Sequence, residues 1–276
     1  MRPFLTWAIS IIMILSMPIM TAAAPNTDNT LLFTRALVQE YSPRTLTRAQ
    51  TKTGFEWQFN SANLTIQKQF EDTIDKKHWI KAEILLIHPF VENGVSKRFI
   101  LIKQQPVQFK QALGENIVGW IDGIIFAEKN GKWEKETSGY NLGYVSGGRF
   151  NPKTDFRMTS LSAKQNAFII RQETTSGDVS LELTEYYITA INHTLKKVAE
   201  IIVAQNIASP EPDGTFRHDT AVVEAVAPQL ETFSPLRVKT TLQWVSSQNK
   251  VVRQHVDAIF YQFDPQSNEY IVQSFR

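Results

Sequence analysis

The chain has 276 residues and contains no cysteine. This absence excludes disulfide bonds, cysteine-ligated metal sites and a lipid-modified N-terminal cysteine. Stability therefore has to come from the burial of apolar side chains. A hydrophobic content of 42%, with 11% aromatic residues, supplies enough material for a core in a chain of this length.

Neither sign of charge dominates, because 29 Lys and Arg residues stand against 27 Asp and Glu residues. A dense run of Lys and Arg is also missing from the sequence. Binding to a phosphate backbone depends on clustered positive charge. We therefore expect no nucleic-acid partner.

Long apolar runs are scarce, and the longest one lies at the N-terminus. Residues 4–20 (FLTWAISIIMILSMPIM) carry no charge, Arg2 precedes them, and the small residues TAAA follow at 21–24. This order is typical of a secretory signal peptide cleaved after Ala23. The alternative is an N-terminal membrane anchor, but Pro18 and the alanine run argue against it.

A signal peptide at residues 1–23 predicts export to the periplasm or the extracellular medium of a bacterium. Its removal takes away Arg2 and no acid, which lowers the net charge from +2 to +1. No later apolar segment reaches membrane length, so we expect no stable membrane span after cleavage.

The residues after the cleavage site predict one helix. One helical face is approximated by Leu31, Leu32, Ala36, Val38 and Tyr41. Thr30 is a suitable N-cap, and Ser42-Pro43 ends the pattern. Residues 43–54 read as a polar connector.

From residue 54 onward the pattern is that of β-strands. Phe55, Trp57 and Phe59 alternate with polar residues, and the pairs Asn93-Gly94 and Asn130-Gly131 are strong hairpin turns. Three strands between residues 166 and 206 predict a meander, although the spacing in LKKVAEIIVA also permits a helix. Residues 236–245 alternate between apolar and polar side chains, which predicts one wet and one dry face.

These patterns predict a mainly β protein of the α+β class. An N-terminal helix would be followed by antiparallel β-meanders that form a sandwich or a curved sheet. Residues 24–276 would make a single β-rich domain, and the polar loop at 206–218 is where it would subdivide.

The stretch GYNLGYVSGGRF at residues 139–150 resembles two catalytic loops without matching either. From Gly143 it approaches a phosphate-binding loop, but Phe150 stands where a metal-binding hydroxyl is needed. Ser146 lies one place too late for a nucleophile elbow. We interpret the stretch as a connection between strands. Tyr140, Tyr144 and Arg149, which lie within it, are the candidate residues of a ligand site near the Asn130-Gly131 hairpin.

Metal-binding patterns are absent from the sequence. The five histidines form neither H-E-x-x-H nor H-x-H, and the acids Glu211, Asp213 and Asp219 lack the spacing of a calcium loop. His255 alternates with Arg253 and Asp257 and is expected to be solvated. We predict no metal and no cofactor.

The order of features from Arg98 to Trp133 resembles that of a group of uncharacterised bacterial exported β-rich proteins. The shared features are a strand such as RFILIKQQ, a GIIF-type strand and a GKWE-type strand. That group carries a Cys-His-x-Cys element where this chain has ALGENIVGW. A redox or metal role based on that element therefore does not carry over.

Because each catalytic template fails in spacing or context, we expect a non-catalytic binding or interaction protein with a protein, peptide or glycan ligand. Two alternatives stay open. One is a hydrolase whose site is assembled from scattered residues, which would show two acids in a deep pocket. The other is an inhibitor of a host enzyme such as lysozyme.

Overall fold

The computed structural model describes residues 27–41, 47–58, 79–107, 117–146, 150–176, 179–228 and 231–273, which form one helix followed by strands. The helix is α1 (Thr27–Tyr41), and the strands are β1 (Thr47–Arg48), β2 (Gly54–Gln58), β3 (Trp79–Glu92), β4 (Val95–Pro106), β5 (Ile117–Lys129), β6 (Lys132–Ser146), β7 (Phe156–Ser160), β8 (Asn166–Ser176), β9 (Val179–Ile191), β10 (Thr194–Ile207), β11 (Phe216–Ala225), β12 (Leu236–Val245), β13 (Val251–Asp264) and β14 (Glu269–Val272).

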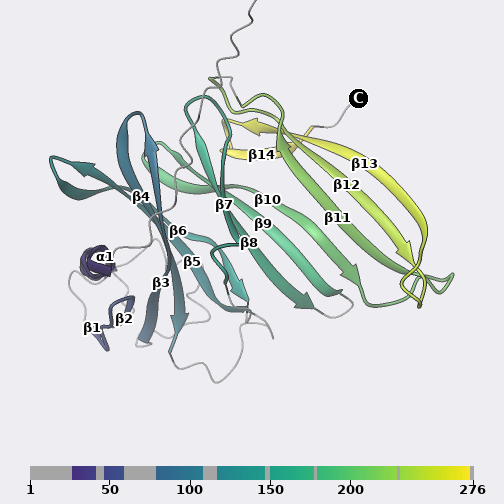
Figure 1. The fold of residues 1–276 in the computed structure, drawn as a ribbon, viewed down its shortest axis with the longest axis horizontal. Coiled ribbons are helices and arrows are strands. Elements are labelled where there is room, and N and C mark those ends of the chain that lie inside the picture. The colour runs from purple at the N-terminus through teal and green to yellow at the C-terminus, as the bar shows by residue number, and fades with distance from the viewer. Residues whose placement is uncertain are drawn as a thin grey trace, which may run out of the picture.

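The strands form one open, curved sheet with the order β1-β2-β3-β4-β5-β6-β10-β11-β12-β13-β14, and β7-β8-β9 attach as a branch at β10. In Figure 1, α1 lies at one end, β8 to β10 cross the middle, and β11 to β13 form a long fan at the other end. Neighbours are antiparallel except at the short contact between β6 and β10. The predicted fold class, a mainly β protein with an N-terminal helix and antiparallel meanders, is confirmed.

Helix α1 begins earlier than the sequence pattern predicts. It starts at Thr27, so Thr30 lies inside the helix and accepts a hydrogen bond from Thr34 Oγ1 at 2.9 Å through its backbone carbonyl. The prediction that Thr30 caps the helix is therefore wrong. Residues 27–30 are all favourable cap types, so the sequence leaves several starting points open.

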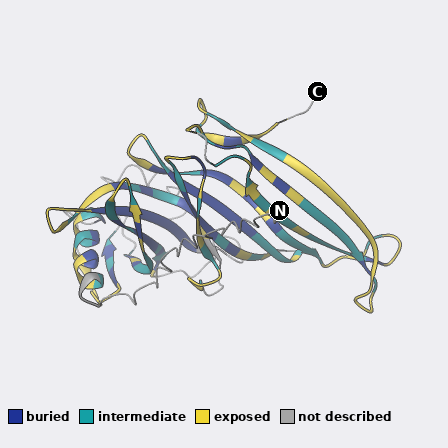
Figure 2. Ribbon diagram, turned by 45° about the horizontal axis from the view of Figure 1, so that its top comes forward, coloured by how far each residue is buried: buried dark blue, intermediate teal, exposed yellow. Residues whose placement is uncertain are grey.

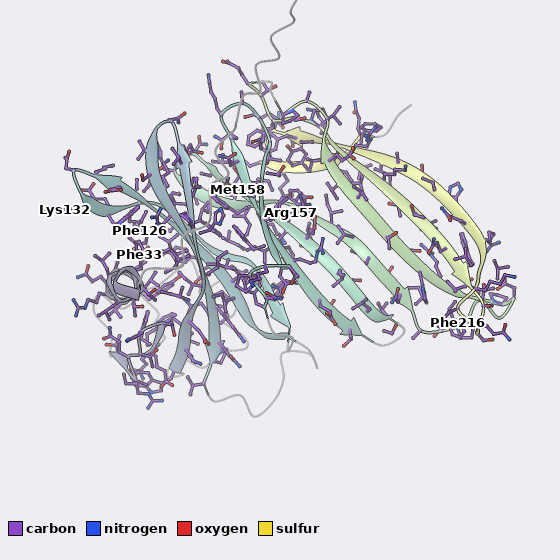
Figure 3. The ribbon with its side chains drawn as sticks, in the orientation of Figure 1. Phe33, Phe126, Lys132, Arg157, Met158 and Phe216 are labelled. Carbon is purple, nitrogen blue, oxygen red and sulfur yellow. The ribbon has the colours of Figure 1, made fainter. Side chains whose placement is uncertain are left out.

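The first core cluster lies between α1 and the sheet. Phe33, Leu37 and Tyr41 follow each other at intervals of four residues, are fully or almost fully buried, and pack on β2 to β5. The predicted apolar face is right for Tyr41, Ala36 and Val38, which belong to or pack against this cluster, but wrong for Leu31 and Leu32, which are 37% and 45% exposed. The ring of Phe33 lies 5.0 Å from that of Phe126, and Figure 3 shows the two labels together beside the helix. Phe55 and Trp57 are buried in the same cluster, as their alternation predicts, whereas Phe59 lies outside the described residues.

Two further core clusters lie on opposite faces of strands β8 and β9. The second lies between β4 to β6 and β8 to β10, where Phe99 and Phe168 stack with ring centroids 4.1 Å apart. The third lies between β8 to β10 and β11 to β14 and includes Leu236 and Val238 from the predicted dry face of β12. Figure 2 shows these buried stretches in the middle of the molecule.

The predicted hairpin turns are confirmed. Asn93 and Gly94 have φ values of 52° and 75°, and Asn130 and Gly131 have 52° and 74°. Positive φ at both central residues is the signature of a type I′ turn, which matches the twist of the flanking strands. The meander at residues 166–206 is confirmed as well, and LKKVAEIIVA belongs to strand β10 and not to a helix.

The interpretation of residues 139–150 as an inter-strand connection is wrong for residues 139–146, which belong to β6. Gly139 and Gly143 serve close packing within this strand. A Cβ atom on Gly139 would lie 2.2 Å from the Leu195 carbonyl oxygen, and one on Gly143 would lie 2.9 Å from the ring of Tyr186. The glycines therefore let β6 approach β9 and β10.

Two expected connections are shorter than the sequence suggests. β1 lies within the polar segment 43–54 and pairs with β2, while residues 43–46 are outside the described part of the chain. β10 runs to Ile207 and β11 begins at Phe216. The sheet continues across this loop, because Ala204 pairs with Thr220 and Asn206 pairs with His218.

A buried carboxylate links β7, β8 and β9 on the third cluster's side of the sheet. The side chain of Glu185 is 2% exposed and accepts hydrogen bonds from Arg157 at 2.7 Å, Arg171 at 2.8 Å and Tyr187 Oη at 3.0 Å. Burial alone would raise the pKa of Glu185, but the hydrogen bonds from Arg171 and Arg157 outweigh burial and lower it.

Replacing Glu185 by glutamine is expected to lower the free energy of unfolding by about 1–2 kcal/mol at pH 7. Because the pKa of Glu185 is lower in the folded chain, its contribution is present above the pKa of the unfolded state and is lost as pH falls through the folded value. Urea titrations at pH 7 and pH 3.5 measure this. Glu269→Gln, an exposed carboxyl in β14, is the control; an equal effect of both variants at pH 7 would contradict the prediction.

Candidate functional site

The predicted ligand-binding residues do not form a group in the structure. The Tyr140 hydroxyl donates a short hydrogen bond to Glu40, and its ring lies edge-on to Tyr41. Burial is the main cause that raises the pKa of Tyr140. Tyr140 thus fastens α1 to the sheet, Tyr144 is 40% exposed, and Arg149 lies outside the described residues. Ligand binding by these three residues stays a prediction.

The histidines and acids singled out in the sequence are also dispersed. The ring of His88 packs 4.8 Å from that of Phe156, and burial together with Arg98 lowers its pKa. Asp213 holds the turn at Thr215, and Asp219 pairs with Arg217. Within the described ranges, no group of three or more His, Asp or Glu side chains is close enough to hold a metal ion.

A polar pocket of about 380 Å³ lies at one end of the second core cluster. Three connections meet there: the β3-β4 turn, the β7-β8 loop and the β9-β10 turn. Phe90, Ile125 and Phe168 form its apolar floor. Its size is within the usual range of small-molecule sites.

A buried lysine between two glutamates forms one wall of this pocket. Lys97 Nζ donates to Glu92 Oε2 at 2.7 Å and to Glu136 Oε1 at 2.6 Å, and the lysine side chain is 9% exposed. Burial alone would lower the pKa of Lys97, but the hydrogen bonds to Glu136 and Glu92 outweigh burial and raise it. The wall therefore carries one positive and two negative charges, with the glutamates partly open to solvent.

Next to this wall, Thr137 lines the pocket and carries a buried hydroxyl. The residue is 4% exposed and lines the pocket, and its Oγ1 has no hydrogen-bond partner among the residues that the structure describes. A buried hydroxyl without a partner costs about 1–3 kcal/mol. A ligand whose entry uncovers this hydroxyl and that donates or accepts a hydrogen bond there would recover part of that cost.

The opposite rim is formed by the β9-β10 turn and the β7-β8 loop. Asn192 and His193 have φ values of 49° and 61°, so both central residues of this turn are left-handed without being glycine. Few residue types accept this conformation, and Asn and His are among them. Asn166 and Lys164 complete the rim, and Lys164 pairs with Glu231 at 3.0 Å.

A second, more open groove of about 530 Å³ lies between α1 and the turn of the β5-β6 hairpin. Leu32, Arg35 and Trp133 are among its lining residues. This groove is next to Asn130-Gly131, where the sequence pointed to a ligand, but neither Tyr140 nor Tyr144 lines it.

No family model, no curated protein and no solved structure matches this chain. Separately, α1 is too short and too polar to cross a membrane, and the described ranges contain no other helix.

Sequence reasoning missed the pocket residues. Glu92, Lys97 and Glu136 look like ordinary solvated charges beside hairpin turns. The β3-β4 turn and the meander that contains the β9-β10 turn were predicted correctly, but the β7-β8 loop was not, and the sequence holds no signal that these three connections meet. A local pattern indicates which residues form a turn and which face of a strand is buried. Whether distant connections meet depends on the curvature of the whole sheet.

Proposed function

We propose that this chain is an exported, non-catalytic binding protein that holds the polar end of a glycan in the pocket between the β3-β4, β7-β8 and β9-β10 connections. The observation that carries the proposal is the partnerless, buried Thr137 hydroxyl beside the Glu92-Lys97-Glu136 wall. Carboxylates, an ammonium group and amides together accept and donate hydrogen bonds, as the vicinal hydroxyls of a sugar require.

The apolar floor supports a glycan over a highly charged ligand. Phe90 and Phe168 are 8% and 2% exposed and meet edge to face at 5.3 Å. A sugar combines hydroxyl groups with apolar C–H faces, which suits a polar rim above an apolar floor. A strongly anionic ligand would lie beside Glu92 and Glu136 at an electrostatic cost.

Binding is tested with soluble neutral oligosaccharides of glucose, galactose and N-acetylglucosamine and with short peptides, measured by calorimetry. Replacing Glu136 by alanine is expected to weaken oligosaccharide binding about 10- to 100-fold, because a hydrogen bond to a charged group contributes about 1.5–3 kcal/mol. Thr137→Val is expected to weaken it less, since it removes one neutral hydroxyl.

Glu134→Ala is the matched control. Glu134 lies on the same strand, is exposed, and pairs with Lys129 away from the pocket. An unchanged dissociation constant for this variant shows that the loss at Glu136 is local. The proposal is wrong if none of the oligosaccharides binds, or if binding survives both Glu136→Ala and Thr137→Val.

A second candidate function, glycoside hydrolysis, is favoured by the presence of two carboxylates in one pocket. Their lysine-bound oxygens, at 2.7 Å and 2.6 Å from the same Lys97 nitrogen, are closer together than the carboxyl groups of inverting enzymes. However, Lys97 occupies the space between them, where the glycosidic bond would have to lie. Release of reducing ends from the same oligosaccharides, abolished by Glu136→Gln, would support hydrolysis over simple binding.

Export belongs to the proposal and rests on the apolar run at residues 4–20 and the small residues after it. The expected result is a protein found outside the cytoplasm with its N-terminus at Ala24. Cell fractionation followed by N-terminal sequencing measures this. A full-length chain retained in the cytoplasm would remove export from the proposal.

A further inference from the structure

Strand β13 has an open outer edge. It pairs with β12 on one side, whereas β14 covers only Tyr261–Asp264 on the other. Every residue from Val251 to Ile259 is exposed, including the apolar Val256 at 45% and Ile259 at 38%. Figure 2 shows this outermost strand of the fan exposed along most of its length. No described residue pairs with this part of the edge through the backbone.

Two hydrogen bonds show which backbone groups face outward. The Phe260 carbonyl accepts from Gln273 N at 2.9 Å, on the β14 side, and Ala258 N donates to the carboxylate of its own neighbour Asp257 at 2.7 Å. Because strand residues alternate with period two, Gln254 and Val256 also direct their backbone groups outward. The outward backbone groups of Gln254 and Val256 are available to another strand, whereas Ala258 N would exchange the Asp257 carboxylate for a carbonyl of that strand.

The side chains along this edge are self-complementary. Arg253 and Asp257 lie two residues to either side of His255. If a second β13 approaches antiparallel with His255 opposite its own copy, Arg253 of each chain faces Asp257 of the other. Gln254 then pairs with Val256 through backbone hydrogen bonds. Arg253 and Asp257 occupy the alternate, closely spaced pairs, where side chains are nearest.

Neighbouring registers lack this match. Centring the pair on Gln254 places Arg253 opposite His255, and centring it on Val256 places Arg253 opposite Ile259. If the two-fold axis lay between two residues, each residue with outward-facing backbone groups would lie opposite one with inward-facing groups. The hydrogen-bond ladder could then not form. Charge and backbone orientation therefore select the same register.

We propose that two copies of this chain associate through β13, antiparallel about a two-fold axis at His255, so that their β11-β12-β13 fans form one continuous sheet. A two-fold contact uses the same patch on both chains, which a charge-complementary strand satisfies by itself. An exposed edge with valines is also an aggregation hazard unless it is covered. The proposal is independent of the glycan pocket.

Charge reversal tests the register. Sedimentation velocity of the processed chain over about three decades of concentration is expected to show a monomer-dimer equilibrium. Arg253→Asp alone and Asp257→Arg alone are each expected to raise the dimer dissociation constant tenfold or more, because like charges then face each other twice. The double variant Arg253→Asp/Asp257→Arg restores both pairs and is expected to dimerise like the native chain.

Mixing the two single variants gives a sharper readout. One chain then carries two acids and the other two arginines at these positions, so a heterodimer is expected although neither homodimer is stable. Both side chains are exposed, and the circular dichroism and thermal midpoint of each variant check that the fold is kept. A native chain that stays monomeric, a dimer insensitive to the single reversals, or a failure of the mixture to pair would each overturn the proposal.

Discussion

Replacing Asp122 by alanine is expected to lower the free energy of unfolding by about 3–5 kcal/mol, one of the two largest effects anticipated for this chain. The carboxylate is fully buried under α1 and accepts hydrogen bonds from Tyr41 Oη at 2.9 Å, Gln104 Nε2 at 3.2 Å and Asn141 N at 2.8 Å. Alanine would leave these donors without the acceptor and open a small cavity beside them.

The position of Asp122 explains why these donors converge. The ladder between β5 and β6 is irregular here, with Ile121 opposite Gly143 and Gly123 opposite Gly139. Asn141, with φ of 52°, lies in the extra length of β6, and its amide donates a hydrogen bond to the side chain of Asp122. Tyr41 then joins the last turn of α1 to the same carboxylate.

Burial raises the pKa of Asp122 to about 7, although hydrogen bonds from Asn141, Tyr41, Gln104 and Trp120 act in the opposite direction. In the unfolded chain the pKa returns to its ordinary value of 3.8. The contribution of Asp122 is therefore fully present below pH 4 and is lost as pH rises through the folded value near 7. The loss amounts to at most roughly 4 kcal/mol.

Urea unfolding of the native chain, Asp122→Ala and Asp122→Asn at pH 5 and pH 8 measures both effects. The stability advantage of the native chain over Asp122→Asn is expected to be larger at pH 5, because asparagine does not titrate. Glu128→Gln, an exposed carboxyl on the same strand, controls for the loss of a charge. Parallel pH profiles for the native chain and Asp122→Asn would show that Asp122 does not titrate as described.

Replacing Gly139 by alanine is expected to lower the free energy of unfolding by about 3 kcal/mol. The added Cβ would lie 2.2 Å from the Leu195 carbonyl oxygen and 2.7 Å from the Leu195 Cβ. Both contacts involve the main-chain path of β10, so a side-chain rotation cannot relieve them. The pairing of Ser138 with Thr194, which joins β6 to β10, lies directly beside the clash.

Gly131→Ala is the matched control for this glycine. A Cβ at Gly131 meets no atom within 4 Å, but φ of +74° costs about 1 kcal/mol for an L-residue. Equilibrium unfolding in urea, with near-ultraviolet circular dichroism to follow the aromatic clusters, compares the two variants. If Gly139→Ala lowered the free energy of unfolding no more than Gly131→Ala does, β10 would move aside without destabilising the protein, and the prediction would be wrong.

The sequence predicts the local features of this protein well, because these depend on neighbouring residues. Asn93-Gly94 and Asn130-Gly131 form the predicted turns, since only a few residue types accept positive φ. Leu236 and Val238 lie on the buried face that their alternation predicts. The start of α1 is less determined, because Thr27 and Thr30 are both acceptable cap types and packing makes the choice.

Residues 139–146 show where local reasoning fails. Glycines usually indicate turns, yet Gly139 and Gly143 lie inside β6 because another strand and the ring of Tyr186 come too close for a side chain. The contacts of Gly139 and Gly143 join segments that are far apart in the sequence. The hydrogen bond from Tyr41 to Asp122 likewise spans 81 residues.

By itself, then, the sequence determined the hairpin turns, the strand faces and the mainly β class, since period and φ preference act over a few residues. Only the tertiary structure decided that three hairpin ends enclose Lys97 and Thr137, that Asp122 is buried, and that the β13 edge stays uncovered. These features follow from the curvature of the open sheet, which sums small twists over many strands and therefore has no local signature.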